Sequence, residues 1–300
     1  MGKCIFVTGG TGFVGTNIIQ SLLDNGYDVK VLSKGDLNGN FPKNVDVIKG
    51  DILEPDSWKN SVDGCDIFIN LIGIIREVKS KNITFEKLHI EASKNVISLC
   101  KAYGIKRLLH MSAAGATYNG VSRYLTTKFE AEELVMASNI NYTIFRPSMI
   151  FGSEDKNINF FASIIKSIGV FPIFGKGDYL LQPVYVKNVA EVFVKSINNP
   201  ACYNKTFCVG GEDIFEYKNL IKIISKSINE NPLLPHIPVS IARILTSIMG
   251  RFQFYPLTRD QLEMLLIGNT CENSDVFNIL NINRKSLKVY LCEHFKKNKK

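Results

Sequence analysis

The sequence predicts an α/β fold, a doubly wound parallel sheet followed by a smaller, mainly helical C-terminal domain. Three features carry this prediction. Short β-branched runs alternate with amphipathic stretches through the first half, a glycine-rich turn joins the first run to the first helical stretch, and clear strand patterns end near residue 209. Repeated strand–helix alternation implies parallel pairing with right-handed crossovers, so helices cover both faces of one sheet. Ligands of such sheets bind beyond the carboxyl ends of the strands.

Each expected element follows from its local pattern. The expected strands are short runs rich in Val, Ile, Leu and Phe, a composition typical of buried strands. They cover residues 4–7, 29–32, 45–48, 67–70, 107–111, 142–145, 184–186 and 206–209. The expected helices repeat apolar residues at a period near 3.6. They cover residues 14–23, 85–103, 122–138 and 157–169, with a further helix from Val189.

Composition limits the class of protein. The 300 residues are 45% hydrophobic and 21% charged, values typical of a globular protein and not of a disordered chain or a coiled coil. No uncharged apolar run reaches the roughly 18 residues that a membrane-spanning helix needs. The four histidines lack metal-ligand spacing, so we expect no metal site. We expect a cytoplasmic protein with no nucleic-acid partner, and peripheral contact at the inner face of a membrane is the alternative.

A glycine-rich turn lies between the first expected strand and helix. Gly9, Gly12 and Gly15 have the spacing G-x-x-G-x-x-G, which allows a tight turn and a close approach of the backbone to a pyrophosphate. The helix N-terminus then offers free N–H groups to the anion. The strand–turn–helix context indicates a dinucleotide-binding Rossmann fold. The expected cofactor contacts here are Gly9, Gly10, Thr11, Gly12, Phe13, Val14 and Gly15.

The position of this turn predicts which part of the chain binds the dinucleotide and which part covers it. Residues 1–150 together with 182–210 are expected to form the dinucleotide-binding domain. Residues 151–181 together with 211–300 are expected to form a small capping domain that contributes to substrate binding.

The identity of the dinucleotide depends on the end of the second strand. A carboxylate there accepts hydrogen bonds from the ribose 2′-hydroxyl, but this chain has Ser33 and Lys34, which suit the 2′-phosphate of NADP(H). NAD(H) stays open because Asp36 follows closely. Asp51 is expected either to contact the adenine amino group or to cap a following helix. Further expected cofactor contacts are Ile52, Leu71, Gly73 and Pro147.

A candidate catalytic group follows the fifth expected strand. Tyr124 and Lys128 are four residues apart, so their side chains share one helix face. A free tyrosine has a pKa of about 10, and a nearby ammonium group together with an oxidised nicotinamide is expected to lower it. Tyr124 would then exchange a proton with a carbonyl or alcohol oxygen, and Lys128 would also hold the nicotinamide ribose. Ser112, at the end of the strand, would orient the substrate oxygen.

With the glycine turn, Ser112 and the Tyr124/Lys128 pair in this order, the sequence resembles the extended or atypical short-chain dehydrogenases/reductases of the NAD-dependent epimerase/dehydratase family. Further motifs are similar to one branch, that of the large accessory subunit of respiratory complex I and its bacterial relatives. These motifs are residues 70–74, 84–89, 122–128, 146–152, 182–186 and 256–260, and the resemblance covers about residues 3–290.

The resemblance implies tight NADPH binding and leaves three functions open. The first is an NADP(H)-dependent oxidoreductase acting on a carbonyl or hydroxyl substrate through Ser112, Tyr124 and Lys128. The second is a nucleotide-binding structural or assembly factor for respiratory complex I or a ubiquinone-biosynthesis complex, with little turnover. The third is a nucleotide-sugar epimerase or dehydratase, against which Leu125 counts, since these enzymes usually carry a small residue after the tyrosine.

An apolar stretch near the C-terminus bears on the second function. Residues 237–250 form an expected helix in which Arg243 is the only charged residue. The favoured interpretation is a buried helix of the small domain. The alternatives are a surface for a membrane or a partner, or a route for an apolar, quinone-like substrate.

Overall fold

The computed structural model describes residues 2–35, 41–42, 44–250, 252, 257–272 and 275–297. The chain forms two compact units. The first comprises Met1–Pro147, Val186–Val209 and Asn273–Ile282, and the second comprises Ser148–Tyr185, Gly210–Glu272 and Asn283–Lys300.

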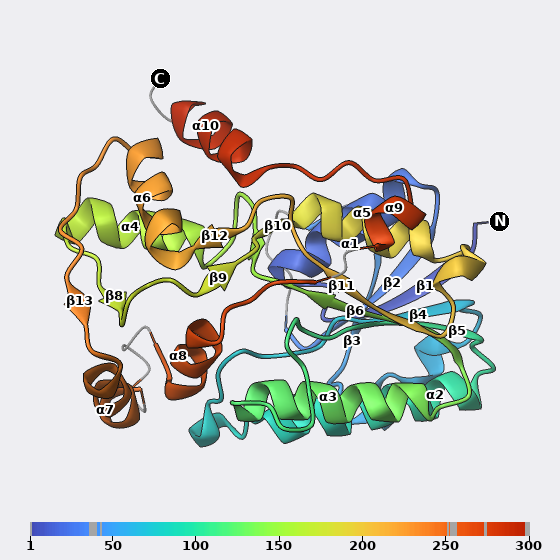
Figure 1. Ribbon diagram of the computed structural model, residues 1–300. Helices are drawn as coiled ribbons and strands as arrows, with labels where there is room; N and C mark the ends of the chain where they lie inside the picture. The colour runs from blue at the N-terminus through green and yellow to red at the C-terminus, as the bar shows by residue number, and fades with distance from the viewer. Residues whose placement is uncertain are drawn as a thin grey trace. The chain divides into compact units, whose positions relative to one another are not determined.

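The first unit is built on one seven-stranded parallel sheet with the strand order β11-β6-β5-β4-β1-β2-β3 (Figure 1). Its strands are β1 (Cys4–Thr8), β2 (Asp28–Ser33), β3 (Asp46–Lys49), β4 (Ile67–Asn70), β5 (Arg107–Met111), β6 (Asn141–Pro147) and β11 (Lys205–Val209). The order reverses direction at β1, which is the mark of a doubly wound sheet. The predicted fold class is therefore confirmed.

Helices cover both faces of this sheet. Helices α1 (Phe13–Asp24) and α5 (Val186–Ser196) lie on one face, and α2 (Ala92–Ala102) and α3 (Arg123–Met136) lie on the other (Figure 1). The predicted helix over 85–103 begins instead as a π-helix over Glu86–Glu91 and becomes α2 only afterwards. Single π-helical turns often occur at functional sites.

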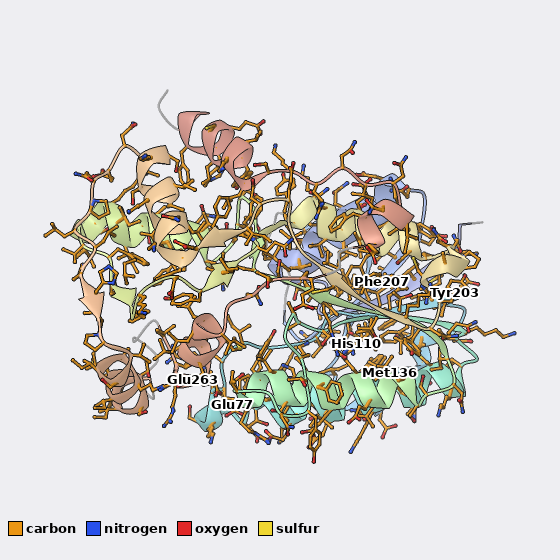
Figure 2. The ribbon with its side chains drawn as sticks, in the orientation of Figure 1. Glu77, His110, Met136, Tyr203, Phe207 and Glu263 are labelled. Atoms are coloured by element: carbon orange, nitrogen blue, oxygen red, sulfur yellow. The ribbon has the colours of Figure 1, made fainter. Side chains whose placement is uncertain are left out.

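The core of the first unit fills the layers between the sheet and the helices. Phe6 of β1 stacks on Trp58 with ring centroids 5.4 Å apart and contacts Phe68 of β4 at 5.2 Å. His110 of β5 is buried in the layer between the sheet and helices α2 and α3 (Figure 2). Because β4 and β5 are buried on both faces, the residues at their centres, Ile67–Ile69 and Leu108–Leu109, are apolar at consecutive positions.

The second unit is mainly helical, with α4 (Ile158–Ile168), α6 (Tyr217–Ser227), α7 (Val239–Met249), α8 (Arg259–Leu266) and α10 (Leu287–Lys297). In the described part of this unit there are also three two-stranded ladders. They pair β7 (Ile150–Phe151) with β10 (Val184–Tyr185), β9 (Leu180–Leu181) with β12 (Phe215–Glu216), and β8 (Ile173–Phe174) with β13 (His236–Ile237). The sequence showed no strand after residue 210, because ladders of two residues carry no periodicity.

The unit boundaries differ from the expected ones at four points, one of which is Gly210, a residue of the second unit. Residues 148–150 and 182–185 belong to the second unit, because β10 pairs with β7 and not with the large sheet. Residues 275–282 belong to the first unit, because α9 (Val276–Ile279) contacts β11. A short helix that joins a unit only through tertiary contact leaves no trace in the local sequence pattern.

Helix α7 is not the buried helix that the sequence favoured. It buries its small residues Ala242 and Thr246 and exposes its large aliphatic ones. The exposed fractions are 49% for Ile241, 60% for Ile244 and 62% for Ile248. We call Ile241, Ile244, Leu245 and Ile248 the α7 face. In the part of the chain that the structure describes, no helix is both long and apolar enough to span a membrane.

Candidate functional site

The glycine turn between β1 and α1 requires glycine at two positions. Gly9 has φ +72°, and a Cβ there would lie 2.7 Å from the carbonyl carbon of Leu71. A Cβ at Gly15 would lie 2.4 Å from the carbonyl oxygen of Gly9. Both distances are far below van der Waals contact, so a side chain at either position would force the turn open. The predicted turn is thus closely packed on itself and on the segment after β4.

The N-terminus of α1 is suited to an anion. Gly12 is its N-cap and provides no side-chain hydrogen bond, and the first turn contains no acidic residue. The first N–H bonded within the helix is that of Thr16, which donates to Gly12 O at 2.9 Å. The amides of Phe13, Val14 and Gly15 therefore have no intrahelical acceptor, and the positive end of the helix dipole adds to their attraction for a phosphate.

Ser33 and Lys34, the predicted 2′-phosphate contacts, lie at the carboxyl end of β2. The Ser33 hydroxyl is buried and donates to Gly35 O at 2.7 Å. Lys34 Nζ forms an ion pair with Asp51 Oδ2 at 2.5 Å, and this hydrogen bond raises the pKa of Lys34. Lys34, the expected contact of the ribose 2′-phosphate, and Asp51, the expected contact of the adenine, are therefore directly paired. Asp36, the residue that kept NAD(H) open, lies outside the described residues.

The Asp51–Ile52 turn is rigidly held. The indole Nε1 of Trp58 donates to Asp51 O at 2.9 Å, and Asn95 Nδ2 of α2 donates to Ile52 O at 2.9 Å. Asp51 Oδ1 accepts from Leu53 N at 3.0 Å. The alternative role of Asp51 as a helix cap does not hold, because Glu54 is the N-cap of the following 3₁₀ turn.

The remaining expected cofactor contacts lie at the carboxyl ends of neighbouring strands. Leu71 N donates to Thr8 O at 2.9 Å, which continues the β1–β4 ladder. Pro147, at the end of β6, accepts from Ala114 N at 2.9 Å. Gly73 lies against Lys128, since a Cβ at Gly73 would be 2.7 Å from Lys128 Nζ.

Lys128 of α3 reaches the ends of two central strands. Its side chain is buried, and Nζ donates to Met111 O at 3.0 Å and to Ile72 O at 3.3 Å. Burial lowers the pKa of Lys128 to about 8, against a smaller opposing effect of the Glu132 carboxylate. The ammonium group is thus fixed where a parallel sheet binds its ligands.

Tyr124, on the same helix, departs from one sequence expectation. Burial raises the pKa of Tyr124 to about 12, where the sequence predicted that Lys128 would lower it. The physical reason is that desolvation of the phenolate dominates, while the Lys128 ammonium is directed toward main-chain carbonyls. Tyr124 is therefore a protonated phenol near neutral pH.

Ser112 directly follows β5. Its amide donates to Phe145 O at 2.7 Å, which fixes its backbone. Its Oγ is buried and has no hydrogen-bond partner among the described residues. A buried hydroxyl without a partner is uncommon in proteins and suits a polar group of a ligand.

His89 is a site residue that the sequence analysis did not single out. Its ring is 1% exposed, stacks on Phe85 at 5.3 Å and meets the ring of Tyr124 edge-on at 5.5 Å. Its Nδ1 is 2.8 Å from Thr127 Oγ1 of α3. Burial lowers the pKa of His89 to about 2, so the imidazole is neutral. The spacing of Phe85 and His89, four residues apart, could have indicated that both lie on one helix face. The same spacing is equally typical of a helix face packed in the core.

A buried polar chain continues from His89 beneath the sheet. Ser93 Oγ donates to His89 O at 2.6 Å, and the Asn70 amide connects Thr8 Oγ1 at 2.9 Å with His110 Nδ1 at 3.2 Å. This chain links β1, β4 and β5 just below their carboxyl ends. Asn70 Nδ2 also lies 3.5 Å from Ser93 Oγ, but His110 Nε2 is buried with no hydrogen-bond partner among the described residues, so the chain is only partly satisfied.

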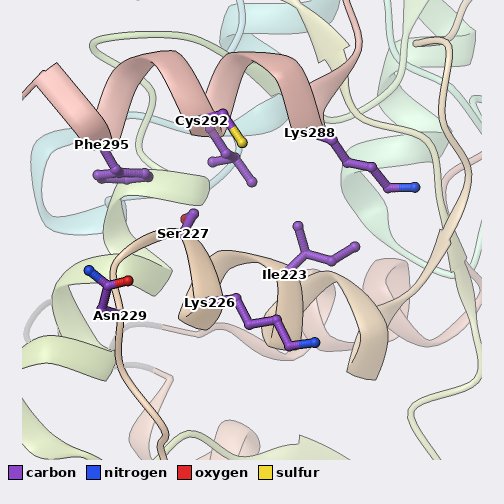
Figure 3. Close-up of a pocket in the computed structure, with 8 residues that line it drawn as sticks. Ile223, Lys226, Ser227, Asn229, Lys288, Cys292 and Phe295 are labelled. Carbon is purple, nitrogen blue, oxygen red and sulfur yellow. The ribbon is translucent and has the colours of Figure 1, made fainter.

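A surface pocket of the second unit involves none of the predicted site residues. It has a cavity volume of about 360 Å³ and lies between α6 and α10 (Figure 3). Its lining is Ile223, Lys226, Ser227, Asn229, Lys288, Leu291, Cys292 and Phe295. Among the residues that the structure describes, no cluster of three His, Cys, Asp or Glu side chains is arranged to hold a metal ion.

The chain is similar in sequence to one known protein family and to individual members of other organisms. Residues 5–210 match the model of the NAD dependent epimerase/dehydratase family. A relative from Arabidopsis thaliana, the mitochondrial NADH dehydrogenase [ubiquinone] 1 alpha subcomplex subunit 9, is 32% identical over 80% of this chain and 62% of its own length. The subunit of the same name from Mus musculus is 28% identical over 88% of this chain and 71% of its own length. The chain therefore spans less than two thirds of the plant relative.

Solved structures share the fold. The UDP-glucose 4-epimerase of Thermotoga maritima superposes with a TM-score of 0.77 over 99% of this chain and 100% of that chain, at 20% identity. At this identity the similarity establishes the architecture and leaves the substrate open.

Proposed function

The chain belongs to the NAD-dependent epimerase/dehydratase family, and we propose that it is an NADP(H)-dependent reductase of a carbonyl substrate, with Tyr124 as proton donor. One observation carries the proposal. Lys128 Nζ is fixed at the carboxyl ends of β4 and β5, one helical turn from a phenol that stays protonated near neutral pH. In the direction of reduction a protonated phenol can supply the proton that the carbonyl oxygen gains along with the hydride.

The residues present fit a dinucleotide. The turn at Gly9 and Gly15 leaves no room for side chains, and the amides at the start of α1 are free to bind a pyrophosphate. The buried, unpartnered Ser112 Oγ supplies a polar atom for the substrate beside it. A bound NADP(H) supplies or accepts the hydride at its nicotinamide ring.

Three side chains divide the remaining work. Tyr124 gives its proton to the substrate oxygen as negative charge develops there. Ser112 Oγ donates a hydrogen bond to the same oxygen and orients it. Lys128, held by Ile72 O and Met111 O, stabilises the phenolate that Tyr124 becomes and binds the nicotinamide ribose with its remaining N–H.

The preference for NADP(H) rests on Lys34, because the Ser33 hydroxyl already donates its hydrogen to Gly35 O. A 2′-phosphate beside β2 would share Lys34 with Asp51, and the ammonium group would form a charge-assisted hydrogen bond with the phosphate. The carboxylate of Asp51 is already neutralised by Lys34, which reduces its repulsion of the phosphate.

Tyr124→Phe tests the proposal. The variant is expected to bind NADPH with unchanged affinity in a fluorescence titration and to lose roughly 10²- to 10⁴-fold in the rate of NADPH oxidation with a carbonyl substrate. Tyr118→Phe is the matched control, because Tyr118 is 70% exposed. Equal rates for the wild type and Tyr124→Phe would exclude Tyr124 as the proton donor.

A second candidate function is supported by the α7 face. Four large aliphatic side chains exposed on one helix suit a protein partner or a membrane-bound complex. Relatives named as NADH dehydrogenase subunits make a structural or assembly role in such a complex the alternative. In this role the nucleotide would be bound without turnover. For this role, a pull-down with the wild type is expected to recover subunits of a respiratory complex, Ile244→Ser/Ile248→Ser is expected to lose them, and Tyr124→Phe is expected to recover them normally.

A further inference from the structure

Two cysteine sulfurs are in contact at the amino-terminal edge of the large sheet. Cys4 opens β1, and Cys65 lies in the turn that leads into β4, the strand beside β1 (Figure 1). Their Sγ atoms are 3.0 Å apart. Two hydrogen bonds join Cys4 to Asp66, one between their backbones from Asp66 N to Cys4 O at 2.9 Å and one from Cys4 N to the carboxylate Asp66 Oδ2 at 2.9 Å. The contact is thus built into the sheet ladder.

The two thiols differ in access. Cys4 is partly exposed, whereas Cys65 is 9% exposed and is packed in the core below it. Burial raises the pKa of Cys65, and the neighbouring Cys4 thiol raises it further, while the Lys30 cation acts in the opposite direction. Lys30 Nζ is held beside this turn by the carbonyls of Ser61 and Asp63. A reagent from solution therefore meets Cys4 first.

We propose that Cys4 and Cys65 form a site of reversible disulfide formation, driven by exchange with a low-molecular-weight disulfide. The Cys4 thiolate attacks one sulfur of the reagent, its S–S bond breaks, and one reagent thiolate leaves and takes up the proton that Cys4 lost. The Cys65 thiolate then attacks Cys4 Sγ and displaces the second reagent thiolate, which takes up the proton from Cys65. Two protein thiols are oxidised, and one reagent disulfide is reduced to two thiols.

The geometry requires little movement. A disulfide needs its sulfurs about 2.05 Å apart, so the Sγ atoms of Cys4 and Cys65 must approach by about 1 Å, which side-chain rotation can supply. The link closes a loop between residues 61 positions apart and so restricts the unfolded chain. The pair lies at the end of the strands opposite to the glycine turn. Oxidation is therefore expected to raise stability without changing nucleotide affinity.

Peptide mapping after oxidation tests the proposal. The full chain is incubated with oxidised glutathione, alkylated, and digested without reduction. We expect a Cys4–Cys65 linked peptide, a thermal midpoint several degrees higher, and reversal of both by dithiothreitol. Cys292, which is exposed, serves as the internal control and should carry glutathione as a mixed disulfide.

Two variants separate the steps. In Cys65→Ala, Cys4 is expected to retain glutathione as a stable mixed disulfide, because the thiol that displaces it is gone. In Cys4→Ser, Cys65 is expected to stay reduced, because it is buried. Wild-type protein in which Cys4 and Cys65 both remain thiols, or in which Cys4 keeps glutathione beside a free Cys65, would overturn the proposal. The wild-type map decides this even if a variant fails to fold.

Discussion

His89 and Tyr124 meet edge to face, with ring centroids 5.5 Å apart and ring planes at 79°. His89 is itself fixed at both nitrogens, by Thr127 Oγ1 at 2.8 Å and by the backbone of Ile74, whose oxygen is 3.2 Å from Nε2. A neutral imidazole therefore ties the segment after β4 to helix α3. The phenol that we propose as the proton donor is oriented by a residue that does not need to touch the substrate.

Removing this support is expected to slow the reaction. In His89→Ala the Tyr124 ring gains freedom, and we expect NADPH oxidation with a carbonyl substrate to fall roughly ten- to hundredfold, since small misplacements of reacting groups are costly. NADPH affinity should change much less. His236→Ala is the control, because His236 is exposed in the second unit. Unchanged turnover in His89→Ala, measured by absorbance at the nicotinamide band, would contradict this role.

The glycine turn offers a way to separate folding from binding. Gly12→Ala adds a Cβ that would meet only Gly9 O, at an ordinary 3.6 Å, so the free protein should keep its thermal midpoint. Its NADPH affinity should fall at least about tenfold, because the backbone can no longer approach a pyrophosphate closely. Gly15→Ala, whose Cβ would clash at 2.4 Å, should lower the midpoint as well. Calorimetry showing full affinity in Gly12→Ala would place the nucleotide elsewhere.

Lys34 is expected to set the choice between nucleotides. Lys34→Ala removes one charge-assisted hydrogen bond to the 2′-phosphate, which corresponds to a loss of about tenfold in NADPH affinity, while NADH affinity should stay the same. Lys59→Ala is a matched control, since Lys59 forms a similar exposed pair with Asp56. Fluorescence titrations of both nucleotides at one ionic strength check this. An equal loss for NADPH and NADH would refute a contact with the 2′-phosphate.

Features set by local pattern were predictable from the sequence. The strands β4 and β5 each contain a short apolar run, Ile67–Ile69 and Leu108–Leu109, and the glycine at position 15 is required by backbone contacts within the turn itself. The placement of Tyr124 and Lys128 on one helix follows from their spacing alone. In each case the cause lies within a few residues of the effect.

Features set by tertiary contact were not predictable in this way. The Lys34–Asp51 pair depends on β2 and β3 being neighbours in a particular register. The raised pKa of Tyr124 depends on desolvation by surrounding segments. For α7, the sequence shows which residues are apolar, but only packing decides that Ala242 faces inward and Ile244 outward. The sequence shows which side chains are present at these positions, but local pattern does not predict which groups surround them.

Two buried histidines are expected to make the protein sensitive to acid. Burial, assisted by the Lys128 charge, lowers the pKa of His89 to about 2 and that of His110 to about 3, whereas both titrate near 6.5 in the unfolded chain. Below pH 6.5 the unfolded state therefore binds protons that the folded state does not. Each histidine then reduces the free energy of unfolding by up to about 1.4 kcal/mol per pH unit as the pH falls.

The contribution of His110 can be isolated by substitution. In His110→Gln, urea denaturation at pH 5, 6 and 7 should show a loss of stability between pH 6 and 5 that is smaller than in the wild type by about 1 kcal/mol, because one of the two groups no longer titrates. His236→Gln should match the wild type, since His236 is exposed. Comparing how the free energy of unfolding changes with pH in the two proteins removes the contribution of the carboxylates, which both proteins share. It also removes any loss of stability from the substitution that does not depend on pH. Identical slopes in His110→Gln and the wild type would mean that His110 is protonated in the folded protein, which its burial opposes.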